Sequence, residues 1–74
     1  MRTIEIDTEP VALCRILKFE NLVMSGGEAK HVIANEMVCV NGKVETRKQK
    51  KIYSGDIIRF GETTMKITLK KGDS

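Results

Sequence analysis

The stretch "SGGEAKHVIANEMVCVNG", residues 25–42, places a helix start, an apolar helical stripe and a hairpin turn one after another. Ser25 is followed three residues later by Glu28, which matches a capping box: the serine oxygen accepts from the glutamate N–H, and the glutamate side chain reaches back to the serine N–H. A helix is therefore predicted to begin after Ser25. Its inward stripe is Ala29, Val32 and Ile33. We expect it to end at Asn35, because asparagine tolerates the left-handed conformation that often closes a helix.

The same stretch continues as a short strand and a turn. "MVCV", residues 37–40, alternates so that Val38 and Val40 share one face. Asn41-Gly42 predicts a β-hairpin, because a type I′ turn needs a positive φ at both central positions and these residue types adopt it at little cost. The return limb of the hairpin is "KVE", residues 43–45.

The flanking segments predict the remaining elements. "TIEI", residues 3–6, alternates as a strand, and "VALCRILKF", residues 11–19, has the apolar spacing of a short amphipathic helix with Pro10 in its first turn. "YSGDIIRF", residues 53–60, indicates a turn and then a strand. "TTMKITL", residues 63–69, alternates with its inward positions at Met65, Ile67 and Leu69. Helices that precede strands joined by tight turns indicate an α+β fold, with two short helices packed on a mostly antiparallel sheet of four or five short strands.

The chain is short and has few cysteines. Its 74 residues predict one domain, 1–74, with a tail, 70–74, that lacks an apolar anchor and frays. Cys14 and Cys39 are too few to staple a small secreted domain, which favours a reducing compartment. Because the sequence shows no secretion leader and no long apolar run, the expected location is the cytoplasm, without attachment to a membrane.

No constellation of residues indicates catalysis. His31 is the only histidine, so it has no companion at metal-ligand spacing, and the two cysteines lie in separate elements. Ser25 and Ser54 are accounted for by a cap and a turn, and there is no phosphate-cradling glycine loop. We therefore expect no enzyme activity, no metal, no cofactor and no small-molecule substrate. One tyrosine, two phenylalanines and no tryptophan also argue against a single-strand binder that stacks several bases.

The positive charge is concentrated in one segment. Residues 43–51 contain five basic residues against one glutamate, a net +4, whereas the whole chain carries +3, so the remainder carries −1. This run has two interpretations: a solvated loop, or a site for the phosphates of a nucleic acid. In an extended chain the side chains at 47, 48, 50 and 51 lie on both sides of the backbone. They can face one groove only if the segment turns or the ligand wraps around it.

The ordered motifs of the chain resemble the S-four RNA-binding domain family, named after ribosomal small-subunit protein four. The resemblance covers residues 11–60 and rests on two leucines in the first helix, a serine-capped second helix, "V.VNG" and "GD.I". The matching residues are Leu13, Leu17, Ser25, Ala29, Ile33, Val38, Val40, Asn41, Gly42, Gly55, Asp56 and Ile58. The chain as a whole is most similar to a short standalone branch of this family, the YbcJ-like proteins.

The resemblance implies an alpha-L motif, in which the helix pair and the hairpin form one surface for structured RNA, such as ribosomal or transfer RNA. The protein is then expected to act at the ribosome or a ribosomal precursor. Its expected oligomeric state is a monomer. Ala12 and Gly26 stand where many members carry basic residues, and Glu36 replaces a common glycine. We expect these departures to shift the contacts toward the hairpin and the basic run.

The candidate RNA-binding residues form one basic set. They are Arg15, Lys18, Lys30, Lys43, Arg47, Lys48, Lys50 and Lys51. The alternative from another class is a small protein-interaction module that docks on an acidic partner surface. Convergence of Lys30 with the 43–51 segment on one face favours RNA, whereas a basic loop opposite an exposed apolar patch favours a protein partner.

Overall fold

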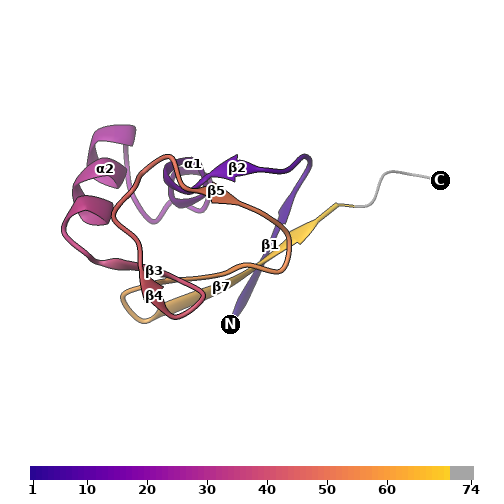
Figure 1. Ribbon diagram of the computed structural model, residues 1–74. Coiled ribbons are helices and arrows are strands. Elements are labelled where there is room, and N and C mark those ends of the chain that lie inside the picture. Colours follow the sequence, from indigo (N-terminus) through magenta and orange to yellow (C-terminus); the bar gives the residue numbers. More distant parts are fainter. Residues whose placement is uncertain (71–74) are drawn as a thin grey trace.

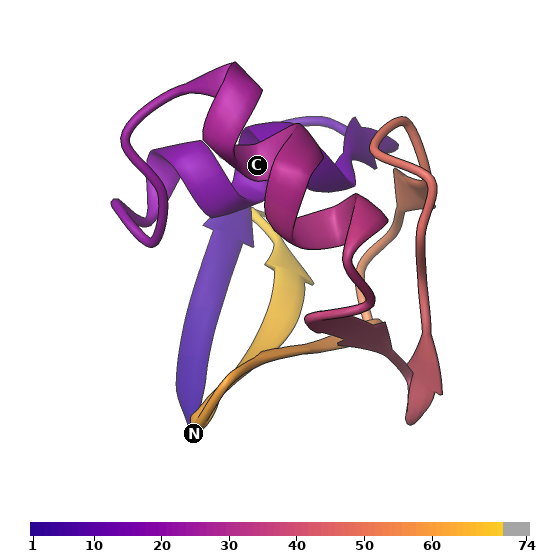
Figure 2. The same cartoon turned by 90° about the vertical axis from the view of Figure 1, so that its left-hand side faces the viewer.

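Two short helices cover one face of a five-stranded sheet (Figure 1). The computed structural model describes residues 1–70. In chain order the elements are β1 (Arg2–Ile6), β2 (Val11–Ala12), α1 (Leu13–Phe19), α2 (Gly26–Ala34), β3 (Val38–Val40), β4 (Lys43–Val44), β5 (Lys51–Ile52), β6 (Ile57–Phe60) and β7 (Thr63–Leu69). Figure 2 shows both helices on the same side of the curved sheet. The predicted α+β architecture is confirmed.

The sheet is mixed, with the strand order β1-β7-β6-β3-β4. β1 runs parallel to β7, and the other neighbouring pairs are antiparallel, as expected of a mostly antiparallel sheet. A separate pairing of β2 with β5 is not indicated by the sequence pattern. It corrects the predicted start of the first helix. Pro10 precedes β2, and α1 begins only at Leu13, because the two residues between them pair with β5.

The N-terminus of α2 is capped by the predicted serine. The Oγ of Ser25 accepts a hydrogen bond from the Glu28 N–H at 3.1 Å. The Glu28 carboxylate accepts from the N–H of Met24 at 2.6 Å, one residue before the predicted donor, Ser25. The serine half of the capping box is therefore confirmed. The glutamate half is displaced by one residue, and both side chains still satisfy backbone donors at the helix start.

The C-terminus of α2 differs from the prediction by one residue. Asn35 has a φ of −90°, and the left-handed residue is Glu36, with a φ of 62°. The N–H groups of Glu36 and Met37 donate to carbonyls in the last helical turn at 3.2 and 3.1 Å, which is a Schellman motif. Asn35 is the C-cap residue of α2, and its side-chain amide donates to the His31 carbonyl at 2.6 Å. Glu36 thus occupies a position that suits glycine.

The β3–β4 hairpin forms as the Asn-Gly pair predicts. Asn41 and Gly42 have φ values of 53° and 84°. The Asn41 side chain also reaches the turn before β6: its Nδ2 donates to Asp56 Oδ1 at 3.0 Å, and its Oδ1 accepts from the Ile57 N–H at 2.9 Å. We call these two hydrogen bonds the Asn41 link. The link holds the "VNG" and "GD" motifs together, which gives both motifs a structural role.

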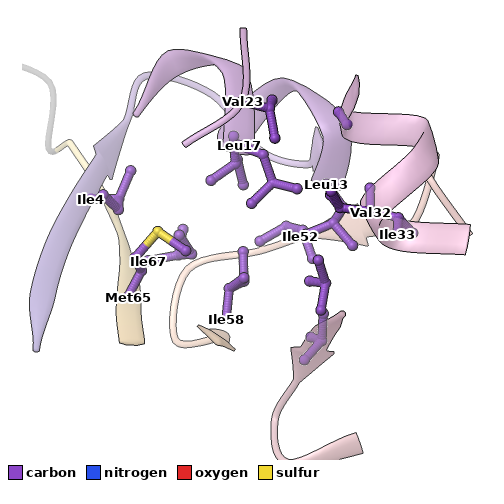
Figure 3. Packing of buried hydrophobic residues seen from close by; sticks show 14 of the residues in the cluster. Ile4, Leu13, Leu17, Val23, Val32, Ile33, Ile52, Ile58, Met65 and Ile67 are labelled. Atoms are coloured by element: carbon purple, nitrogen blue, oxygen red, sulfur yellow. The ribbon is translucent and has the colours of Figure 1, made fainter. Parts of the chain in front are cut away.

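The hydrophobic core lies between the helices and the sheet (Figure 3). Its fully buried side chains come from both helices and four strands and include Leu13, Ile16, Leu17, Ile33, Val38, Ile52, Ile58, Met65 and Ile67. Leu69, which the alternation predicts to point inward, is 38% exposed. That prediction is wrong because the C-terminal end of β7 extends beyond the helices (Figure 1).

The chain after β7 is described for one residue only. The N–H of Lys70 donates to the Ile6 carbonyl at 2.8 Å, which continues the pairing of β7 with β1. The rest of the tail that we expect to fray, residues 71–74, lies outside the described residues. Within residues 1–70, neither helix has the length and apolar composition needed to cross a membrane.

Candidate functional site

The basic run forms a loop whose backbone turns. We call residues 45–51, from the end of β4 to the first residue of β5, the basic loop. The N–H of Lys50 donates to the Arg47 carbonyl at 3.2 Å, which closes a four-residue turn with Lys48 and Gln49 at its corner. Figures 1 and 2 show the loop rising from the hairpin to the level of the helices. The turn meets the condition under which the cations of this segment can face one groove.

The basic loop is hydrogen-bonded to the start of α1. The N–H groups of Leu13 and Cys14 donate to the carbonyls of Lys50 and Lys48 at 2.9 and 3.1 Å. These acceptors matter because the N-cap residue, Ala12, has no side-chain oxygen to satisfy the first N–H groups of the helix. The β2–β5 pairing holds the same region. The carbonyls of Lys48 and Lys50 therefore face α1, and the loop backbone is not a freely solvated chain.

The loop side chains line a concave surface that we call the basic concave surface. Its lining residues are Arg47, Lys48, Gln49, Lys50 and Lys51. Four of the five are cations, so the surface has the electrostatic character of an anion-binding site. Four of the five residues are exposed, and Lys50 is half-buried. The local fold therefore places these four basic residues around one hollow, whereas an extended chain would direct their side chains to two sides.

Glu45 orients the arginine at one end of this surface. Its carboxylate accepts from the Arg47 Nε at 3.1 Å and from the Arg47 backbone N–H at 3.0 Å. These hydrogen bonds, from the guanidinium first and the backbone second, lower the pKa of Glu45 below its ordinary value. The same contact raises the pKa of Arg47. The Arg47 side chain remains 72% exposed, so the pairing positions it and still leaves it open to a ligand.

The other candidate residues lie outside the lining of the basic concave surface. Arg15 and Lys18 are exposed on α1, Lys30 is exposed on α2, and Lys43 is exposed on β4. Lys43 pairs with Val40, whose side chain is buried, so strand alternation directs Lys43 to the helix-covered side of the sheet. The structure thus brings the loop cations together and leaves Lys30 on a separate helix.

The sequence reasoning missed two residues of this site. Gln49 lies at the corner of the turn and contributes to the concave surface, and Glu45 positions Arg47. A search for basic residues omits both, because glutamine is neutral and glutamate is acidic. Their position within the basic run is the one feature of the sequence that could have indicated a role in this site. Cys14 and Cys39 are free and half-buried. Among residues 1–70, no three His, Cys, Asp or Glu side chains are gathered as a metal site.

Comparison with known proteins places the chain in a family. It matches the family model described as "S4 domain" over residues 4–68. The chain belongs to the S4 domain family. This S4 domain is 40% identical over 68 residues to YbcJ of Escherichia coli (strain K12), covering 90% of this chain and 97% of YbcJ. It is 38% identical over 57 residues to the "Probable ribosome maturation protein RlbA" of Bacillus subtilis (strain 168), covering 77% of this chain and 80% of RlbA.

The solution structure of E. coli YbcJ has the same fold as this S4 domain. The two superpose with a TM-score of 0.70 at 39% sequence identity, over 92% of this chain and 87% of that one. The YbcJ structure is described as revealing an alpha-L motif involved in RNA binding. The resemblance to the S-four family and its YbcJ-like branch is confirmed. This S4 domain contains α1, α2 and the β3–β4 hairpin, the elements from which the resemblance predicts that motif.

Proposed function

We propose that this S4 domain binds structured RNA, ribosomal or transfer RNA, and catalyses no reaction. The observation that carries the proposal is the basic concave surface, in which four cations extend from a backbone hydrogen-bonded to α1. Two relatives support it: the YbcJ structure is described by its RNA-binding motif, and the name of RlbA refers to ribosome maturation. We further propose that the domain acts as a monomer in the cytoplasm, at the ribosome or one of its precursors.

Two physical properties suit this surface to phosphates. The first is charge, because basic side chains that neutralise the phosphates of a nucleic acid release its bound counterions, which favours association. The second is preorganisation. Since α1 already holds the loop backbone, binding has to order side chains only, which lowers the entropy cost of association. RNA duplexes are recognised mainly through their shape, phosphates and 2′-hydroxyl groups, all of which a rigid basic edge can contact.

The candidate residues divide into central and outer contacts. The proposed central contacts are the cations of the basic concave surface, Arg47, Lys48, Lys50 and Lys51. The proposed outer contacts are Arg15, Lys18, Lys30 and Lys43. Lys43 lies on the helix-covered side of the hairpin and Lys30 lies on α2, both outside the lining of the basic concave surface. The central group is the part of the proposal that the loop geometry supports directly.

The salt dependence of RNA affinity tests this assignment. With about four phosphates neutralised, the logarithm of the association constant for a transfer RNA or a ribosomal RNA hairpin should fall against log salt with a slope of roughly −3 to −4. Changing Lys48→Glu together with Lys51→Glu should weaken binding and reduce the magnitude of the slope by about 2. Filter binding or fluorescence anisotropy at several KCl concentrations measures both quantities.

A matched control makes the same change of charge on the other side of the sheet. Arg59 and Lys66 are exposed, and their strand neighbours Ile58 and Met65 are buried, so both basic side chains face away from the helices. Arg59→Glu with Lys66→Glu should leave the slope near the wild-type value. Equal losses of RNA affinity in the two double variants would show that binding depends on total charge. An unchanged salt slope in the loop variant would show that the basic loop does not contact the RNA phosphates.

Cross-linking in cells followed by sequencing of the attached RNA identifies the partner. Enrichment of ribosomal or transfer RNA over a mock control is the expected result. Recovery of no RNA, together with capture of an acidic protein that the loop variant no longer binds, would favour the protein-interaction alternative.

A further inference from the structure

A second hollow, which we call the β1 groove, lies between β1, β2 and α1 and has a volume of about 510 Å³. Ile4, Ile6 and Ile16, all buried, contribute its apolar lining. Of the basic residues proposed to contact RNA, Arg15 alone lines this groove, and the cations of the basic concave surface do not. It is large enough for a flat aromatic group, and its lining combines apolar, aromatic and polar residues, as small-molecule sites do.

The α1 side of the groove carries an exposed stacking surface. Phe19 is 62% exposed at the end of α1, and the Arg15 guanidinium lies 5.6 Å from the centroid of its ring. Both residues line the groove. Exposed aromatic rings and arginine planes are the surfaces on which proteins stack unpaired bases. Phe19 lies outside the buried core cluster, so packing of the core does not account for it.

The β1 side of the groove offers free backbone groups. β1 is the outer strand of the sheet, so among residues 1–70 no strand pairs with one side of its backbone. The carbonyl of Ile6 faces β7, where it accepts from the Lys70 N–H at 2.8 Å. Because backbone groups alternate along a strand, the N–H and C=O of Glu5 face the free side, which borders the groove. An adjacent donor and acceptor complement the edge of a nucleobase.

The charge of the groove selects against phosphate. Its lining includes the acidic residues Glu5, Asp7 and Glu20, and Arg15 is its one basic residue. Carboxylates repel phosphate and accept hydrogen bonds from the amino groups of bases. If part of an RNA enters this groove, the charge pattern favours the base over the backbone.

Gln49 connects the groove to the basic concave surface, because it lines both. A nucleotide whose phosphate contacts the loop lysines therefore lies one side chain away from the groove. We propose that the β1 groove binds one unpaired base of the RNA, stacked on Phe19 and Arg15, with its edge toward the free backbone of β1. This inference rests on the proposed RNA-binding function and adds a specificity site to it.

Two RNA hairpins that differ in one base test the proposal. One carries a single bulged adenosine, and the other carries an abasic nucleotide at the same place, so their phosphates are the same. The wild-type protein should bind the adenosine hairpin roughly tenfold more tightly, the gain expected of one base on an aromatic platform. Phe19→Leu should abolish this ratio and leave the salt slope unchanged. Tyr53→Leu, which alters another exposed aromatic residue outside the groove lining, should keep the ratio.

The outcomes separate this inference from the proposed function. If wild-type protein binds the two hairpins equally, with the expected salt slope, the base site is overturned and RNA binding stands. If it binds neither hairpin, both are overturned. Amide chemical shifts provide a second measurement: the adenosine hairpin should shift the Glu5 N–H more than the abasic one does. A Glu5 shift produced by an extended apolar peptide, and by neither RNA, would assign the groove to a protein strand and overturn the proposal.

Discussion

The Asn41 link should supply a large part of the stability of this small domain, and Asn41→Ala removes it. The change deletes the hydrogen bond to Asp56 at 3.0 Å and the one from the Ile57 N–H at 2.9 Å. It also places alanine at a φ of 53°, in the left-handed region that asparagine tolerates and alanine does not. The change adds no bulk, so the core residues keep their packing.

The magnitude follows from these two losses. Each hydrogen bond contributes about 0.5–1.5 kcal/mol net, and the lower half of that range applies because the groups are exposed. The left-handed conformation adds roughly 1 kcal/mol for alanine relative to asparagine. The free energy of unfolding should therefore fall by about 2–3 kcal/mol. A chain of 74 residues has about 4–10 kcal/mol in total, so the melting temperature should drop by about 10–20 °C.

Urea unfolding followed by circular dichroism measures this difference, and Asn41→Gly divides it into its two parts. Glycine adopts the positive φ without strain but makes neither hydrogen bond, so it should lose about 1–2 kcal/mol. RNA affinity, measured at a temperature where every variant is folded, should stay at the wild-type value, because Asn41 acts on the fold. If Asn41→Ala unfolds within 0.5 kcal/mol of wild type, well below the losses estimated above, the reasoning about the link is refuted.

Two further predictions concern glutamates. Glu36→Gly should raise the free energy of unfolding by about 0.5–1 kcal/mol, since Glu36 holds a φ of 62° that glycine adopts without strain; a lower melting temperature in this variant would contradict that account. Hydrogen bonds from Arg47 keep the pKa of Glu45 below its ordinary 4.5. The ionised Glu45 therefore contributes stability above pH 4.5, and this contribution is lost as the pH falls through the folded-state pKa. Glu45→Gln should reduce this acid dependence in urea unfolding below pH 4.5, and a stability–pH profile identical to wild type would show that the pairing does not contribute.

Local patterns in the sequence predict α2 and the hairpin well. The Ser25 cap and the positive φ at Asn41 and Gly42 depend on residues within a few positions of one another. The errors arise where a distant partner decides. The first helix begins later than Pro10 indicates because β2 pairs with a strand some forty residues away. Leu69 is exposed although its alternation is regular, because alternation does not reveal how far the helices extend over the sheet.

The sequence by itself determined both helices, the strands of the main sheet, the family and the concentration of positive charge between residues 43 and 51. These follow from the spacing of apolar residues, from the residue types that form turns and from the number of charged residues in each segment. Only the tertiary structure decided how that charge is presented. Ala12 leaves the first N–H groups of α1 without a side-chain acceptor, and the carbonyls of Lys48 and Lys50 take that place. The physical reason is that a helix end must satisfy its free N–H groups. The segment that satisfies them lies far along the chain, and those hydrogen bonds hold the backbone of the loop whose residues line the basic concave surface.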